Sequence, residues 1–196
     1  MNARAFYDLV NARRGHFLLE SGLHAERWLD LDPLFADQHR LAPIVTELAH
    51  EMRPHRIDVV CGALVGGAFL ALLLAQALDT EFCFTERATP SGAEGLYQAR
   101  YSLPSGYVSR LSGKRIAIVD DVMSAGSALR GTYAELRRHS LEPVAAGALL
   151  VLGNKGAHFF AKNEIPVVAC ARDEFATWTP AECPLCANAV PLEPRA

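Results

Sequence analysis

Two neighbouring carboxylates stand where a predicted strand ends. Asp120 and Asp121 follow the apolar run from Ile116 to Val119 and precede a loop of small residues, 124–126, that leads into a predicted helix. Backbone N–H groups at a helix N-terminus carry partial positive charge and suit a phosphate. Carboxylates repel phosphate and instead suit the hydroxyls of a neighbouring sugar, or water on a phosphate-bound Mg²⁺. The pattern therefore predicts a sugar-phosphate site.

The same segment has other interpretations. It also fits a solvated turn in which Ser127 merely caps the helix. An NTPase with acids at a strand end also needs a Gly-x-x-x-x-Gly-Lys-Ser/Thr loop, which the sequence lacks, and a Gly-x-Gly-x-x-Gly dinucleotide fingerprint is absent as well. We favour the sugar-phosphate interpretation over the solvated turn.

The elements that must position this site alternate between strand and helix. Strands are predicted at 15–22, 57–61, 81–85, 115–122, 144–152 and 165–170, and helices at 2–13, 37–53, 66–78, 127–139 and 156–163. Such alternation indicates an α/β fold with a parallel central sheet flanked by helices. Ligands in these sheets bind at the carboxyl ends of strands, so functional residues should follow Cys61, Phe84, Val119 and Leu152. The irregular stretch 88–113 is predicted to be a functional loop or lid.

Composition narrows the class of protein. The chain has 196 residues, a formal net charge of -3 and a pI near 6.2, which disfavours a nucleic-acid binder. We expect a single domain, 1–196, with a core at about 40–175 and a small hood from about 1–35 plus the C-terminal tail. No apolar run is long enough for a membrane span, and the five cysteines are interpreted as reduced thiols of a cytoplasmic protein.

The acid pair and its loop resemble the phosphoribosyl pyrophosphate motif of type I phosphoribosyltransferases, in which a Thr/Gly-rich loop follows two acids. The resemblance implies that fold with an N-terminal hood, and it assigns Asp120 and Asp121 to the ribose hydroxyls. The 5′-phosphate loop would consist of Ser124, Ala125, Gly126, Ser127 and Ala128. This chain has Ser-Ala-Gly-Ser-Ala where the family has Thr-Thr-Gly-Gly-Thr or Ser, so some hydroxyl donors are lost.

Further segments are similar, in order, to the orotate-specific members of that family. The stretch 15–22, which contains Phe17, resembles the strand that covers the base, and 84–87 resembles the segment leading into the catalytic loop. The Cys183-Pro184-Leu185-Cys186 ending also resembles some bacterial and archaeal members. A pyrophosphate loop is implied at Gly62, Ala63, Leu64, Val65 and Gly66.

The resemblance also implies the chemistry. Pyrophosphate would leave with the help of Mg²⁺, bound through that substrate, and of mobile cations, for which Arg87 and Arg100 are the candidates; Asp121 is counted with them as catalytic. The Lys/His-rich catalytic loop of better-known members is missing. Lys155 stands where orotate enzymes carry a base-binding arginine.

Several alternatives stay open. The base is most simply orotate, but another nucleobase fits, and so does a regulatory protein that binds phosphoribosyl pyrophosphate without turnover. The partners implied are that substrate, a nucleobase and a second copy of the chain, with neither nucleic acid nor membrane. Trp28 is interpreted as a packing residue. Cys183 and Cys186 with Cys170 would make three thiolates without a well-spaced fourth ligand, so no metal-ligating residue is assigned.

Overall fold

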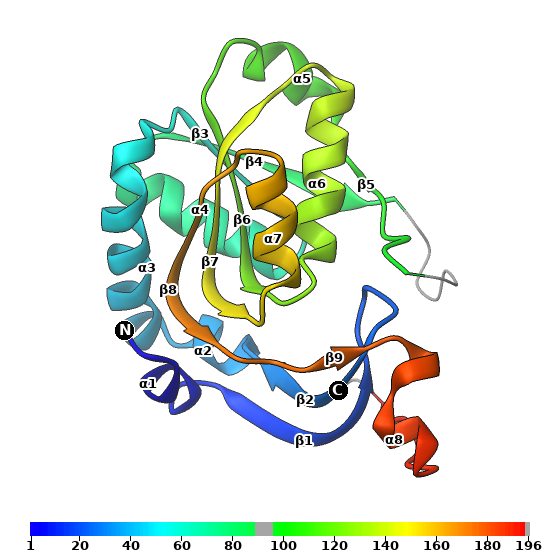
Figure 1. The fold of residues 1–196 in the computed structure, drawn as a ribbon. Helices are drawn as coiled ribbons and strands as arrows, with labels where there is room; N and C mark the ends of the chain where they lie inside the picture. Colours follow the sequence, from blue (N-terminus) through cyan, green and yellow to red (C-terminus); the bar gives the residue numbers. More distant parts are fainter. Residues whose placement is uncertain (89–95, 195–196) are drawn as a thin grey trace.

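The computed structural model describes residues 1–88 and 96–194. Within these residues the chain forms a large sheet and a small one (Figure 1). The large sheet has the strand order β5-β4-β3-β6-β7-β8. Its strands are β3 (Val59–Ala63), β4 (Glu81–Arg87), β5 (Tyr101–Ser102), β6 (Ile116–Met123), β7 (Pro143–Leu152) and β8 (Val167–Asp173). All neighbours are parallel except β5, which is antiparallel to β4, so the predicted parallel sheet carries one antiparallel edge strand.

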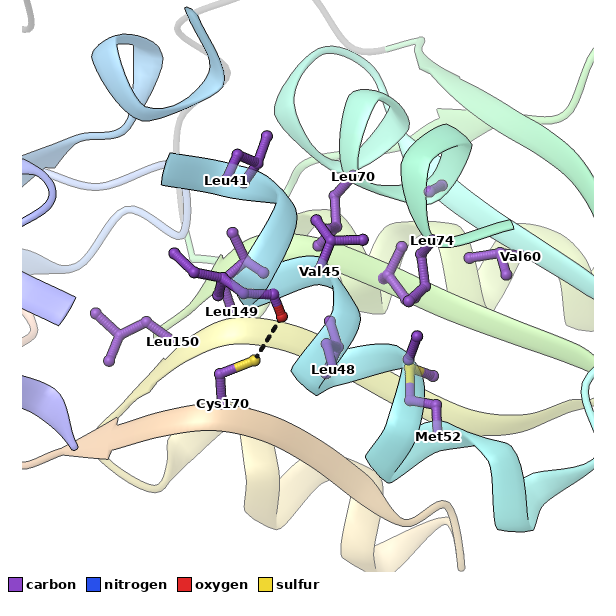
Figure 2. Close-up of a cluster of buried hydrophobic side chains, with 14 of the residues drawn as sticks. Leu41, Val45, Leu48, Met52, Val60, Leu70, Leu74, Leu149, Leu150 and Cys170 are labelled. Carbon is purple, nitrogen blue, oxygen red and sulfur yellow. Dashed lines mark hydrogen bonds between the residues drawn. The ribbon is translucent and has the colours of Figure 1, made fainter. Parts of the chain in front are cut away.

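Helices cover both faces of the large sheet. On one face lie α3 (Gln38–Met52) and α4 (Gly66–Leu78), and on the other lie α5 (Ser105–Leu111), α6 (Ser127–Arg138) and α7 (Lys155–Lys162). Asp37 caps the N-terminus of α3, and its carboxylate accepts hydrogen bonds from the backbone N–H groups of His39 and Arg40. Apolar side chains from α3, α4 and the sheet interdigitate beneath that face, as Figure 2 shows for Leu48, Leu74 and Leu149.

The hood is the small sheet, β1-β2-β9, together with the segments around it. Its strands are β1 (Asn11–Leu18), β2 (His24–Asp30) and β9 (Thr177–Trp178), with the helical segments α1 (Ala3–Tyr7), α2 (Asp32–Ala36), η2 (Pro180–Glu182) and α8 (Pro184–Ala187) nearby. A further 3-10 turn, η1 (Arg53–His55), ends α3. The hood was predicted from about 1–35 plus the C-terminal tail, and the strand β9, which the sequence did not predict, lies in it.

Two predicted segments differ from the structure. The first helix ends at Tyr7 rather than at residue 13, and the following strand begins at Asn11 because residues 11–18 pair with β2. The stretch 88–113 contains β5 and α5 and so is not irregular throughout. Leu103 and Leu111 are buried, so the second half of this stretch packs against the core. The lid prediction falls partly on residues 89–95, which lie outside the described residues.

Among residues 1–88 and 96–194 no helix is long and apolar enough to cross a membrane.

Candidate active site

A cavity of about 400 Å³ lies between the hood and the carboxyl ends of the central strands. Its lining combines three segments: the β1–β2 turn with most of β2, the stretch from Asp120 to Ala128, and the ends of β7 and β8. Of the four strand ends predicted to carry functional residues, the described lining includes residues after Val119 and Leu152 itself, but none that follow Cys61 or Phe84. The cavity unites residues that are about a hundred positions apart in the sequence.

The predicted phosphate loop forms one wall of this cavity. Ser124, Gly126, Ser127 and Ala128 line it, whereas Ala125 is buried behind them. Gly126 has φ +74°, a left-handed conformation that L side chains rarely adopt, and it immediately precedes α6. The Ser127 hydroxyl is buried without a hydrogen-bond partner among the described residues. An anion at the helix N-terminus would satisfy this donor together with the backbone N–H groups.

The acid pair lies next to this loop on β6, and both carboxyl groups line the cavity. Burial, then the negative charges of Asp121 and Glu20, raise the pKa of Asp120 well above its ordinary value. Burial likewise raises the pKa of Asp121, although the backbone N–H of Val122 donates to its carboxylate over 2.7 Å. Two carboxyl groups that are costly to ionise together favour a ligand bringing hydroxyl donors or a cation.

The implied pyrophosphate loop lies directly against the acid pair. A Cβ atom built on Gly66 would be 2.5 Å from Oδ2 of Asp121, and one on Gly67 would be 2.8 Å from Oδ1 of Asp120. Gly62, Ala63 and Leu64 lead from β3 into this loop, where the N–H of Leu64 donates to the carbonyl of Thr85, and the side chain of Val65 is exposed. The glycines therefore let two loops meet at one place.

The two predicted catalytic arginines occupy different surroundings. Arg87, at the end of β4, forms an ion pair with Glu20, which lines the cavity, and Tyr101 donates a hydrogen bond to the same carboxylate over 3.1 Å. Arg100 is exposed, and its carbonyl accepts from the N–H of Ala88. The described cavity lining includes neither arginine. Arg87 is joined to it by Glu20, and the backbone of Arg100 pairs with that of Ala88, which follows Arg87.

Two predicted base-binding residues lie outside the described lining. Phe17 is fully buried in the hood and packs against the ring of Trp28, with centroids 6.2 Å apart. Lys155 starts α7, and its ammonium group donates to the carbonyl of Thr177 over 2.9 Å. Lys155 is the first residue of α7, which follows β7, and this contact directs its side chain toward β9.

Several cavity residues were not predicted from the sequence. Trp28 lines the cavity, so its assignment to packing was incomplete, and Arg27 beside it is the one cation in the described lining. Phe175 also lines the cavity, and the Arg27 guanidinium lies 5.5 Å from the centroid of its ring. The Ser21-Gly22 dipeptide is a turn signal that would have predicted β2, the strand that carries Arg27 and Trp28.

The sequence matches a known protein family and several of its members. Residues 35–178 match the phosphoribosyl transferase domain family. The chain is 27% identical over 187 residues to an orotate phosphoribosyltransferase of Caldanaerobacter subterraneus, covering 95% of this chain and 91% of the relative. It is 28% identical over 206 residues to the orotate phosphoribosyltransferase of Helicobacter pylori, covering 99% and 98%.

Solved structures share the fold. The orotate phosphoribosyltransferase of Aeropyrum pernix superposes with a TM-score of 0.62 at 23% identity, covering 82% of this chain and 87% of the other. The adenine phosphoribosyltransferase of Thermoanaerobacter pseudethanolicus gives 0.64 at 14% identity, covering 87% and 99%. Because enzymes for different bases superpose equally well, the fold alone does not select the base. The matched residues 35–178 include β6 and α6, which form the sugar-phosphate geometry described above. The chain therefore belongs to the phosphoribosyltransferase family and is an enzyme of the glycosyltransferase type that depends on phosphoribosyl pyrophosphate.

Proposed function

We propose that the enzyme transfers phosphoribose from 5-phosphoribosyl 1-pyrophosphate to orotate, giving orotidine 5′-monophosphate and pyrophosphate. The observation that carries this proposal is the composition of the cavity, where Arg27 of the hood is the one cation in the described lining. Its Nη2 donates to the carbonyl of Glu174 over 3.0 Å and its Nη1 lies 3.6 Å from the Asp173 carboxylate, whereas its Nε is buried without a partner among the described residues. Orotate carries a carboxylate that an arginine recognises well. The names of the sequence relatives point to the same base.

The rest of the lining supports a sugar diphosphate that arrives with a metal ion. Within the described residues, five carboxylates line the cavity with that one arginine: Glu20, Asp30, Asp32, Asp120 and Asp121. A bare polyphosphate would be repelled by such a wall, whereas Mg²⁺ neutralises it and takes oxygen ligands readily. The acid pair therefore fits Mg²⁺ through its bound water, and bound Mg²⁺ would stabilise the charge of the leaving pyrophosphate.

The residues of this chain have separate roles in the proposed reaction. The N-terminus of α6 holds the 5′-phosphate, and Asp120 and Asp121 accept hydrogen bonds from the ribose hydroxyls. The loop from Gly62 to Gly66 faces the pyrophosphate. The bond from C1 of the ribose to pyrophosphate breaks, and a bond to a base nitrogen forms as that nitrogen loses its proton to solvent or to the leaving pyrophosphate. Positive charge develops on the ribose in the transition state, and the nearby carboxylates stabilise it.

We infer that Arg87 acts on the leaving group when its contact with Glu20 changes. Its partner Glu20 lies in the β1–β2 turn, so the ion pair joins the hood to β4 of the central sheet. The pair is mostly shielded from solvent, and exchange of Glu20 for a pyrophosphate oxygen would cost little Coulomb energy. We therefore keep Arg87 as the catalytic cation and assign Arg27 to the base.

The experiment that tests the proposal measures pyrophosphate release from phosphoribosyl pyrophosphate and Mg²⁺, with orotate, uracil, adenine and guanine offered separately. We expect release with orotate only, and none after Mg²⁺ is chelated. Release with another base would overturn the choice of orotate and keep the reaction. Binding of the sugar diphosphate by calorimetry with no release for any base would instead support a regulatory protein. The double variant Asp120→Asn/Asp121→Asn is the inactive control.

A homodimer remains part of the proposal. Four large apolar side chains are exposed on α4 and the turn before it: Leu64 at 39%, Val65 at 64%, Phe69 at 52% and Leu72 at 52%. Exposed apolar side chains that gather on one element commonly mark an interface. A second copy of the chain is the simplest partner, since most soluble oligomers are symmetric homo-oligomers.

A further inference from the structure

Two histidines and two cysteines from distant parts of the chain converge within the hood. They are His16 of β1, His24 at the start of β2, and Cys183 and Cys186 around α8. One side-chain atom from each, a ring nitrogen or a sulfur, lies within 4.8 Å of all the others. Three of the four residues are buried, with His16 at 1%, His24 at 5% and Cys183 at 2% exposed. The sequence offered only the two cysteines as neighbours.

Three nitrogen–sulfur separations in the cluster are close to those of a tetrahedral metal centre. Nε2 of His16 lies 3.5 Å from Sγ of Cys183 and 3.7 Å from Sγ of Cys186, and Nδ1 of His24 lies 3.2 Å from Sγ of Cys186. Tetrahedral zinc, with bonds of about 2.3 Å to sulfur and about 2.0–2.1 Å to nitrogen, sets neighbouring ligand atoms about 3.3–3.8 Å apart. The two ring nitrogens are 2.8 Å apart, and binding of a metal would increase this distance by about half an ångström.

The backbone around the cluster orients its ligands. Nδ1 of His16 lies 2.7 Å from the carbonyl of Val190, which only accepts, so the ring donates there and directs the lone pair of Nε2 into the cluster. Histidines that bind metals commonly use their other nitrogen in this way. His16 also lies in a β-bulge, because the register of β1 against β2 shifts between Arg14 and Phe17. Bulges re-aim side chains, here toward the C-terminal segment.

The third thiol considered from the sequence does not join the cluster. The Sγ atom of Cys170 donates to the carbonyl of Ile44 over 3.4 Å, inside the core beneath α3 (Figure 2). Burial raises the pKa of Cys170 to about 12, so it stays a neutral thiol there. The missing fourth ligand is instead supplied by the histidines, which are more than 150 positions from the cysteines.

We propose that His16, His24, Cys183 and Cys186 bind one structural Zn²⁺ that ties the C-terminal segment to the hood. Binding releases the thiol protons of both cysteines, and the two thiolates cancel the charge of Zn²⁺, which suits a buried centre. Four protein ligands leave no open position, so the metal has a structural role. The site is separate from the cavity and does not depend on which base the enzyme uses.

The first test is metal content and coordination. Protein made with a tag that lacks histidine, without chelator, should contain about one zinc per chain by elemental analysis. Co²⁺ added to chelator-treated protein should give the absorption of tetrahedral cobalt with a thiolate charge-transfer band, and Zn²⁺ should abolish it. A chain with no bound zinc and no tetrahedral cobalt spectrum, or one whose mass shows a Cys183–Cys186 disulfide in place of metal, would overturn the proposal.

Matched variants separate the site from adventitious binding. Cys186→Ser changes an exposed ligand and should reduce zinc content about tenfold, whereas Cys170→Ser makes the same chemical change outside the cluster and should retain it. His24→Gln should lose zinc, and His50→Gln, on the exposed side of α3, should not. Chelator should lower the melting temperature of the unmodified chain and of Cys170→Ser, but not that of Cys186→Ser. Equal zinc in all four variants would mean surface binding and would sink the assignment.

Discussion

The carboxylate of Asp121 occupies the space that a side chain at residue 66 would need. The Oδ2 atom of Asp121 would lie 2.5 Å from a Cβ on Gly66, and the distance is kept short because the other carboxylate oxygen accepts from the N–H of Val122. The ribose acids and the implied pyrophosphate loop therefore meet with no room for even a methyl group.

Gly66→Ala should therefore disturb the site more than the fold. The methyl group must push the Asp121 carboxylate aside, so we expect the Kd for phosphoribosyl pyrophosphate to rise at least about tenfold, about 1.4 kcal/mol. Calorimetry with the sugar diphosphate and Mg²⁺ measures it. Gly106→Ala is the matched control, since nothing lies within 4 Å of its added Cβ. An unchanged Kd in Gly66→Ala would show that this contact is unimportant.

Replacing both acids with asparagine should stabilise the unliganded protein while abolishing binding. The raised pKa values mean that the folded chain holds protons that the unfolded chain has already lost, so stability falls as the pH rises from the ordinary value of 3.8 through the folded pKa. Asp120→Asn/Asp121→Asn removes this penalty and should add about 0.5–2 kcal/mol at neutral pH.

Denaturant melts of that double variant from acidic to neutral pH, with calorimetry of sugar diphosphate binding, check both parts. The decline in stability above pH 4 should be shallower in the variant than in the unmodified chain. Asp79→Asn, an exposed acid after α4, is the control and should change neither property. A variant that melts lower and still binds would contradict the site assignment.

Arg27→Met should act on the base rather than on the sugar diphosphate. If the guanidinium binds the carboxylate of orotate, KM for orotate should rise about tenfold or more while KM for phosphoribosyl pyrophosphate stays nearly constant. Arg27→Lys should recover part of the loss, because it restores the charge without the planar fork. Steady-state kinetics with each substrate varied measure the effect, and Arg40→Met in α3 is the control. An equal rise in both KM values would indicate a general collapse of the hood.

Arg87→Ala should lower kcat more than it weakens binding. The proposed role of Arg87 is in the transition state, so we expect a fall of about tenfold or more in kcat with a smaller change in the Kd of the sugar diphosphate. Glu20→Gln separates this role from the ion pair, since it removes the partner's charge and keeps the arginine. Full activity in Arg87→Ala would assign the residue to the hood contact alone.

Phe69→Glu should dissociate a homodimer. The phenyl ring is half exposed on α4, and a charge buried in a symmetric interface is repeated on the partner, which doubles its cost. Light scattering after gel filtration should report a dimer for the unmodified chain and a monomer for the variant. Glu51→Gln on the exposed side of α3 should remain dimeric. A monomeric unmodified chain would refute the dimer.

Local patterns in the sequence determined the central fold and half of the candidate site. The strand before Asp120, the small residues before α6 and the apolar α4 are encoded by neighbouring residues, so their types and order sufficed. The acid pair and phosphate loop could be predicted because all of their donors and acceptors lie within nine consecutive positions, 120–128.

Only the tertiary structure decided which distant residues meet. Arg27 and Trp28 reach the cavity because β2 folds back over the sheet, and Lys155 turns instead toward Thr177. His16 and His24 lie next to Cys183 and Cys186 because β9 pairs with β2 and brings the following C-terminal segment to β1 and β2. Long-range pairing depends on the sum of many weak packing terms, which no local spacing in the sequence records.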